Sequence, residues 1–169
     1  MTNKPLSSVL KFYIPLFALS LLFSCKQNTT SFTASQAASI KDSVMQLANN
    51  TAKDITAKGP IAWLDYFENS PDFFMASDGD LAFVNYAAAN SFIKNTLVHQ
   101  MRAITLKWSN IRINPTSPDY ATMAANFHED ITDLAGKTMP FDGYFTATVH
   151  QTTKGWKYLN MHWSIKPGK

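Results

Sequence analysis

The chain beyond residue 34 shows first the hydrophobic spacing of helices and later that of strands. Between Ser35 and Ala57 the apolar residues are separated by three, four or seven positions, which places them on one face of an amphipathic helix. We expect Ser35 to be its N-cap. Lys58 and Gly59 end this helix, and Pro60 suits the first position of the next one, where its missing N–H would be unpaired anyway. The second helix is predicted to be short and aromatic.

A small hairpin and a third helix are predicted next. The apolar runs Asp72–Ala76 and Leu81–Val84 are joined by a segment that contains Asp78-Gly79, a dipeptide favoured in two-residue hairpin turns. From Tyr86 to Val98 the helical spacing returns, and Asn85 is the expected N-cap. These elements complete the helical half of the chain.

The rest of the chain alternates with period two, which predicts a long antiparallel meander. In its first strand the apolar positions change parity after Trp108, so we expect a β-bulge near Ser109 and Asn110. The predicted strands cover residues 104–113, 119–133, 144–151 and 156–165. Helix, helix, hairpin, helix and meander is the order of an α+β domain, in which helices pack on one face of a curved sheet.

The last predicted strand is partly apolar on both faces. Strict alternation separates two sets of residues: Trp156, Tyr158, Asn160, His162 and Ser164 on one face, and Leu159, Met161, Trp163 and Ile165 on the other. A strand covered by helices on one side and by a partner subunit on the other would show this pattern, so we expect a homodimer. The alternative is a monomer with an apolar outer sheet surface.

The N-terminal segment resembles a bacterial lipoprotein signal. Lys4 and Lys11 flank the start of an apolar stretch, and Cys25, the only cysteine, follows Leu22-Phe23-Ser24 as in a lipobox. The resemblance implies a lipid on Cys25 and three parts of the chain: a signal peptide (1–24), the lipidated cysteine with a flexible tether (25–34) and one domain (35–166). An ordinary signal peptide and an uncleaved anchor are the alternatives, but the apolar run is shorter than the roughly 20 residues that cross a bilayer.

Net charge and cysteine content argue against several classes of partner and site. Removal of residues 1–24 would leave 13 of the 15 basic residues against 12 acidic ones, so the net charge would fall from +3 to +1. No basic cluster with interleaved aromatic residues remains, and we expect no nucleic-acid partner. A single cysteine excludes an intramolecular disulfide and a thiolate metal site, and we expect neither metal nor cofactor. We expect anchoring in the cell envelope, and Lys26 after the cysteine favours the outer membrane. The sequence does not distinguish the periplasmic face of that membrane from the outer face.

The last strand and the hairpin also carry a family resemblance. The strand begins with Gly155-Trp156-Lys157 and ends with His162-Trp163-Ser164, and the Asp78-Gly79 turn precedes the third helix. With the element order, these features resemble the nuclear transport factor 2-like superfamily, in particular its SnoaL-like branch, over residues 35–166. The resemblance implies a cone-shaped domain in which a curved, mostly antiparallel sheet wraps a helix around a pocket and which commonly dimerises through the sheet. Its members include isomerases, dehydratases and cyclases of polyketide or steroid-like substrates, and also non-catalytic binders and assembly domains, so fold does not decide function.

Two titratable residues are candidates for catalysis. Glu129 has the strand parity of Phe127 and Ile131, and burial of that face would desolvate its carboxyl group and raise its pKa, as a proton-abstracting base requires. It fails as a base if the strand bends into water there. His162 is the second candidate, expected to face the pocket as a general acid or base, with a structural histidine bonded to a backbone carbonyl as the alternative. His128 and Asp130 are read as a solvent-facing pair with too few ligands for a metal.

The aromatic residues predict a ligand pocket. The expected lining comprises Trp63, Tyr66, Phe67, Phe74, Trp108, Tyr144, Tyr158 and His162. Stacking on these rings suits a small apolar or aromatic ligand, unless side chains fill the space completely.

Three hypotheses on function follow. The first is an envelope-anchored lipoprotein that binds such a ligand or a protein partner without catalysis. The second is a proton-transfer isomerase, dehydratase or hydrolase with Glu129 or His162 as base and Tyr66 or Tyr144 as hydrogen-bond donor to an oxyanion. The third is a structural assembly module that uses the exposed sheet.

Overall fold

The computed structural model describes residues 32–167, which form one domain around a continuous hydrophobic core. The predicted signal peptide, Cys25 and most of the tether lie outside the described residues. The helices are α2 (Ala34–Lys58), η2 (Pro60–Ala62), α3 (Trp63–Tyr66), α4 (Tyr86–Asn95) and η3 (Leu97–His99). Among residues 32–167 no helix is both long and apolar enough to cross a membrane.

The N-cap of helix α2 lies two residues earlier than predicted. The Thr33 side chain accepts a hydrogen bond from the Gln36 N–H (3.1 Å), and the Gln36 side chain accepts one from the Thr33 N–H (2.7 Å). This reciprocal capping box satisfies two donors that the first turn leaves free, whereas Ser35 lies inside that turn. The prediction of Ser35 as N-cap is therefore wrong, and a Thr-x-x-Gln pattern identifies the true start.

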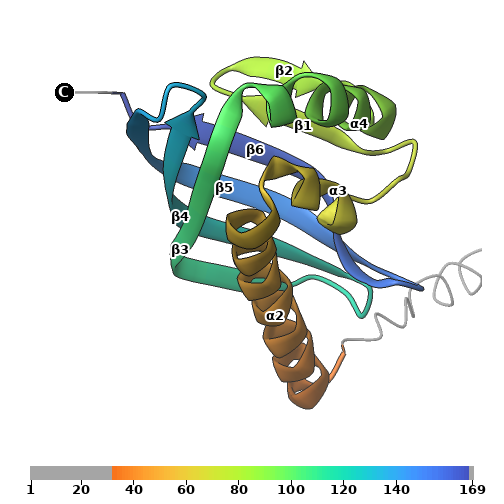
Figure 1. Ribbon diagram of the computed structural model, residues 1–169. Helices are drawn as coiled ribbons and strands as arrows, with labels where there is room; N and C mark the ends of the chain where they lie inside the picture. The colour runs from red at the N-terminus through yellow and green to blue at the C-terminus, as the bar shows by residue number, and fades with distance from the viewer. Residues whose placement is uncertain (1–31, 168–169) are drawn as a thin grey trace, which may run out of the picture. The chain divides into compact units, whose positions relative to one another are not determined.

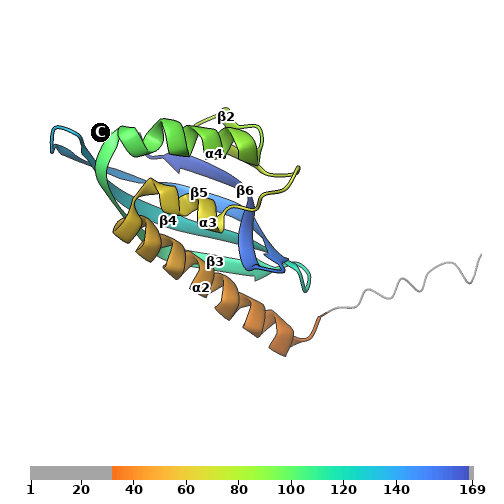
Figure 2. The ribbon, with the colours of Figure 1, turned by 45° about the vertical axis from the view of Figure 1, so that its right-hand side comes forward.

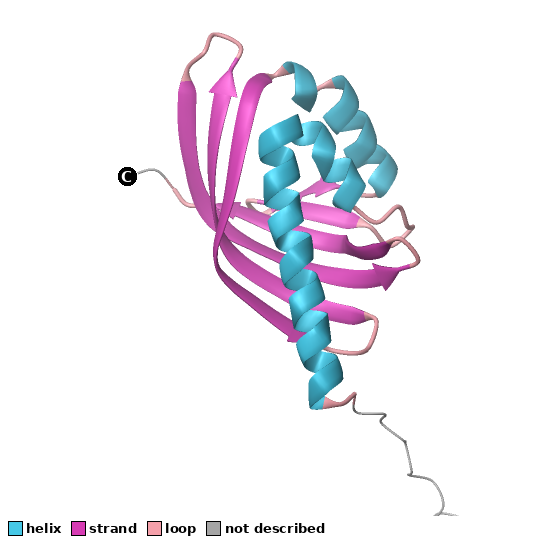
Figure 3. Cartoon of the chain, turned by 60° about the horizontal axis from the view of Figure 1, so that its bottom comes forward, coloured by secondary structure: helices cyan, strands magenta, loops and turns pink. Residues whose placement is uncertain are grey.

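One mixed sheet forms the second layer, with the strand order β2-β1-β6-β5-β4-β3. Its strands are β1 (Phe74–Ser77), β2 (Asp80–Phe83), β3 (Met101–Pro115), β4 (Tyr120–Asp133), β5 (Thr138–Thr152) and β6 (Gly155–Ile165). Only β1 and β6 pair in parallel within this sheet. The helices lie on one side of the sheet, with α2 along β3 (Figure 1), and the long strands curve around them (Figure 3). The predicted α+β class and its curved, mostly antiparallel sheet are confirmed.

The hairpin and the third helix form as predicted. Asp78 and Gly79 have φ angles of 51° and 97°, the left-handed pair that a tight two-residue turn between β1 and β2 requires. The tip is tied to β6, because the Asp78 N–H donates to the Trp163 carbonyl (3.1 Å) and the Asp78 carboxylate accepts from the Ile165 N–H (2.8 Å). Helix α4 begins after Asn85, whose side chain caps it.

Two irregularities decide which side chains face the helices. The predicted bulge is present in β3: its pairing with β4 shifts between Ser109 and Arg112, and Asn110 has a φ of 52°. A second bulge in β6 was not predicted. Thr148 pairs with Asn160 and Val149 pairs with Tyr158, which leaves Leu159 as the extra residue.

The bulge at Leu159 reverses the expected faces in the first half of β6. Tyr158 is completely buried under the helices, on the same side as Met161 and Trp163. The opposite face of β6 therefore presents mainly polar residues, including Asn160 and His162. The apolar outer face from which the homodimer was inferred is absent from β6, because a single inserted residue changes the parity of a strand.

Candidate functional site

A pocket of about 410 Å³ opens between the helices and the inner, helix-covered face of the sheet. Its walls come from α3, α4, the hairpin and the ends of β3, β4 and β6. Figure 2 shows α3 and α4 on the same side of the sheet. The lining includes Trp63, Phe67, Met75, Ser77, Phe83, Phe92, Ile93, Ile104, Glu129, Ile131, Met161 and Trp163. The pocket has the size and apolar character of small-molecule sites.

Glu129 is the single titratable side chain among the described residues that line this pocket. It lies on β4 between its cross-strand neighbours Leu106 and Phe141, and only 8% of its surface is exposed. Removal from water disfavours the charged form and raises the pKa of Glu129 to about 7. The expected burial of this carboxyl group is confirmed, while its catalytic role stays a prediction.

Glu129 has no protein partner within residues 32–167: the structure contains neither a hydrogen bond nor an ion pair to its carboxyl group, and burial alone accounts for its pKa. Ser77 is the one residue with a hydroxyl group among the described residues of the lining, and this hydroxyl donates a hydrogen bond to the Asp78 carboxylate (3.1 Å). The pocket therefore offers a ligand one buried carboxyl group in apolar surroundings, and this group changes its protonation state near pH 7.

Aromatic rings from the helices and from the sheet line much of the pocket. Trp63 stacks on Phe67 with ring centroids 5.5 Å apart, and its ring stands at 86° to that of Trp163. Phe83 and Phe92 form a second pair at 5.4 Å. Of the residues predicted to line the pocket, Trp63 and Phe67 are in place, and these contacts fix their orientation.

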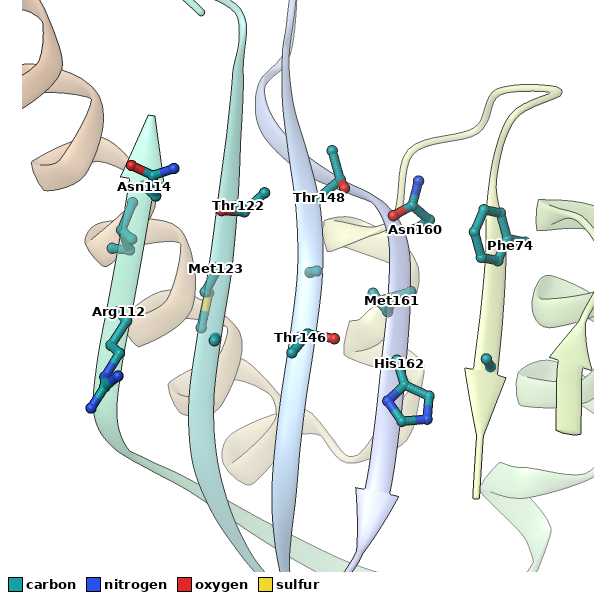
Figure 4. Close-up of a pocket in the computed structure, with 14 residues that line it drawn as sticks. Phe74, Arg112, Asn114, Thr122, Met123, Thr146, Thr148, Asn160, Met161 and His162 are labelled. Carbon is teal, nitrogen blue, oxygen red and sulfur yellow. The ribbon is translucent and has the colours of Figure 1, made fainter. Parts of the chain in front are cut away.

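His162 and Phe74 lie on the other side of the sheet. His162 follows Met161 and precedes Trp163, both inward, so alternation turns its imidazole to the open face. Phe74 is 43% exposed on that face and occupies the position beside Asn160. Figure 4 shows both side chains on the open face, with α2 behind the sheet. The prediction that they line a common pocket with Trp63 is wrong.

The other predicted lining residues are also outside the inner pocket. The Tyr66 hydroxyl donates to Asp54 (2.8 Å), and Tyr144 is 42% exposed on the open face. Trp108 packs in the core against Phe145, and Tyr158 is fully buried. Neither tyrosine that was proposed as an oxyanion donor therefore faces Glu129.

The open face has a hollow of its own, of about 520 Å³ (Figure 4). It is lined by residues from five neighbouring strands, which include polar ones such as Arg112, Asn114, Thr146 and Asn160 and apolar ones such as Phe74. The described residues hold no group of three metal-ligating side chains, here or in the inner pocket. This face therefore offers hydrogen bonds and the positive charge of Arg112 together with apolar contacts.

His128 lies at the edge of that face, half-exposed as expected. Its Nδ1 is 2.9 Å from the Asp142 carboxylate, and its Nε2 is 3.4 Å from that of Asp130. The hydrogen bond to Asp142 is the main cause that raises the pKa of His128. The pair with Asp130 that the sequence suggested is present, and Asp142 is the closer partner.

Several wall residues were missed at the sequence level. On β1 the residue that lines the pocket is Met75, whereas the sequence analysis predicted Phe74. Phe83 from the hairpin and Phe92 from α4 also line it. Trp163 was placed on the strand face opposite His162, and because His162 was expected in the pocket, Trp163 was not assigned to it. Alternation within the hairpin and the helical spacing in α4 carry the relevant signal, but neither pattern shows which inward residues leave space between them.

The fold matches solved structures closely although the sequences have diverged. A nuclear transport factor 2-like superfamily protein from Salmonella enterica serovar Typhimurium superposes with a TM-score of 0.66 at 18% identity, covering 78% of this chain and 94% of that one. This chain has the nuclear transport factor 2-like fold. The expected fold is thereby confirmed. The sequence matches no protein-family model and no curated protein.

Two further nuclear transport factor 2-like structures show the range of functions on this fold. A candidate scytalone dehydratase from Novosphingobium aromaticivorans superposes with a TM-score of 0.70 at 12% identity and covers 80% of this chain and 89% of that one. The hexachlorocyclohexane dehydrochlorinase LinA-type3 from Novosphingobium barchaimii reaches 0.64 at 9% identity, with coverages of 80% and 92%. At these identities the likeness concerns the fold, and the function must be argued from the site.

Proposed function

We propose that this protein binds a small, largely apolar molecule in the inner pocket without transforming it. The supporting observation is an aromatic cavity of about 410 Å³ in which Glu129 is the single titratable side chain among the described residues. Apolar walls supply affinity and one polar group fixes orientation, which is the usual design of a small-molecule site. Membership of the SnoaL-like branch is part of this proposal.

A second candidate function is proton transfer with Glu129 as the base. A carboxyl group with a pKa near 7 is suited to accept a proton at neutral pH. An isomerase, dehydratase or hydrolase also needs a group that stabilises the developing negative charge, and His162, Tyr66 and Tyr144 lie outside this pocket. Catalysis needs this second group, whereas binding does not. We therefore place binding first.

Titration of the protein with the neutral fluorophore N-phenyl-1-naphthylamine tests the binding proposal. The protein is used as residues 26–169, because all described helices and strands and their core lie within 32–167. We expect saturable binding, with a change in the fluorescence of Trp63 and Trp163, which line the pocket. Ala82→Phe on the pocket wall should abolish it, whereas the matched change Ala76→Phe on the open face should not. Absence of saturable binding, or equal loss in both variants, would refute the proposal.

We further propose that Cys25 carries a lipid that anchors the domain in the cell envelope, with the outer membrane as the destination. The basic start, the apolar run and the lipobox-like Leu22-Phe23-Ser24 support it. Intact-mass measurement of protein extracted from bacterial membranes should show a chain that begins at Cys25 with added acyl mass. Cys25→Ser should give no acylated species, and an unmodified full-length chain in the wild type would contradict the anchor.

Homodimerisation through the open face is also proposed, since the helices described within residues 32–167 lie on the other side of the sheet (Figure 1). Its lining combines polar and apolar side chains, so hydrogen bonds would accompany apolar contacts in the interface. Sedimentation analysis should give a dimer, and Thr146→Arg near the middle of this face should yield monomers. A monomer at all protein concentrations would refute this proposal and leave the inner pocket unaffected.

A further inference from the structure

The carboxyl group of Glu129 lacks a positive partner although it is buried. The side chain is 8% exposed, and Leu106 and Phe141 lie on its two sides in the sheet. No lysine, arginine or histidine is present among the described residues that line the pocket. An ionised carboxylate in such surroundings is costly unless a counter-charge is supplied. The pocket therefore favours a ligand that brings this charge with it.

The aromatic walls favour the same kind of ligand. Trp63 and Trp163 present rings that are nearly perpendicular, at 86°, and Phe67, Phe83 and Phe92 extend the aromatic surface. The faces of aromatic rings attract cations, most strongly in tryptophan, and this attraction grows when water is excluded. A carboxylate that shares a pocket with such rings suits the recognition of an ammonium group.

Neutral polar ligands have little to bind. Ser77 donates its hydroxyl proton to Asp78, and the other side chains in the lining, apart from Glu129, have apolar contact surfaces or only an indole N–H to offer. A ligand rich in hydrogen-bond acceptors would lose water without gaining equivalent donors. A cation with an apolar body avoids this loss, because its single polar group meets Glu129.

We propose that the ligand of the inner pocket is an apolar amine or quaternary ammonium compound whose cationic head pairs with Glu129 between the aromatic rings. Its apolar part occupies the rest of the roughly 410 Å³ volume. This inference rests on the proposed binding function of the same pocket and names the chemical class of its ligand.

A matched pair of ligands separates charge from shape. Benzyltrimethylammonium and neopentylbenzene have the same outline and differ in one positive charge. Both are titrated against bound N-phenyl-1-naphthylamine at pH 8.5, where Glu129 with a pKa near 7 is ionised. We expect the cation to displace the fluorophore at concentrations about tenfold lower or more.

Glu129→Gln keeps the shape of the side chain and removes its charge. In this variant the two ligands should bind with similar affinity, while the neutral one binds at least as well as to the wild type. Asp142→Asn is the matched control, since it removes a carboxylate from the open face, and it should preserve the preference for the cation. Circular dichroism verifies that each variant is folded.

The wild type offers an independent measurement that needs no variant. The preference for the cation should decline as the pH falls below about 7, because protonation removes the charge of Glu129, the one titratable group among the described residues of the lining. Equal affinity for both ligands at pH 8.5, or a preference that persists in Glu129→Gln, would overturn the ammonium proposal while the binding function stands. Failure of the fluorophore and of both ligands to bind would refute the binding function itself.

Discussion

The indole Nε1 of Trp108 donates a hydrogen bond to the backbone carbonyl oxygen of Ala48 at 3.0 Å, which links β3 to the middle of α2. A second bond runs in the same direction, from the Leu106 N–H to the Thr56 hydroxyl (3.1 Å). Trp108 also contacts Trp163 at a ring distance of 5.7 Å. The long helix is thus positioned on the sheet by directional bonds as well as by its apolar face.

Trp108→Phe should lower the free energy of unfolding by about 1–2 kcal/mol. Phenylalanine preserves part of the ring packing but leaves the Ala48 carbonyl without its donor, and the smaller ring leaves a void. Urea denaturation followed by circular dichroism measures the effect. Trp156→Phe is the control, because the structure contains no hydrogen bond from the Trp156 indole, and an equal loss in both variants would contradict the assigned role.

Gly143→Ala should destabilise the domain by about 1–3 kcal/mol. A Cβ atom at this position would overlap the ring of Phe127 and the carbonyl oxygen of Ser164. The Phe127 ring in turn packs on Trp163 at 4.2 Å, so it has little room to move away. Thermal unfolding compared with Thr146→Ala, on the open face of the same strand, tests this crowding. A wild-type melting temperature in Gly143→Ala would show that the ring shifts freely.

Glu129→Gln should stabilise the protein above pH 7 and remove part of its pH dependence. The pKa of Glu129 is about 7 in the folded chain against 4.5 for the free side chain, so the folded state holds a proton that the unfolded state releases between these values. The stability of the wild type relative to the variant therefore falls from pH 4.5 to 7 and stays low above. The difference approaches about 3 kcal/mol, and denaturant unfolding at several pH values should show it. A pH-independent difference between the two proteins would disprove it.

His128 should titrate above the ordinary range of histidines. Its hydrogen bond to Asp142 favours the imidazolium form, so the pKa is raised. Asp142→Asn should return the titration of the His128 ring, followed by NMR, toward the normal value. Identical His128 curves in both proteins would rule out the proposed pair.

Regular alternation made most of the fold predictable. The inward set on β4, the bulge beside Asn110 and the Asp78-Gly79 turn follow from local spacing, and the structure has all three. The bulge at Leu159 was missed because apolar or aromatic residues occur at both parities along this strand, so the pattern is also consistent with uninterrupted alternation. Only the pairing with β5 determines which of these side chains is inserted.

The candidate site was predictable for its carboxyl group but not for most of its walls. The position of Glu129 between the inward Phe127 and Ile131 was sufficient to predict burial. The assignment of His162 failed since an aromatic-rich strand suggested an inward histidine, whereas Trp163 takes that direction. Which inward side chains enclose a cavity depends on how α4 and the hairpin pack, and this packing involves contacts between segments distant in sequence.

The fixed tip of the hairpin has a consequence for the route by which a ligand enters. Asp78 is hydrogen-bonded to the backbone at the end of β6. The tip of the hairpin is therefore fixed to its neighbouring strand and is poorly suited to swing outward. Helix α4 forms the opposite wall, and its Phe92 is 37% exposed at the edge of the pocket. We therefore expect entry and departure to pass Phe92, with a residence time set by how often α4 moves aside.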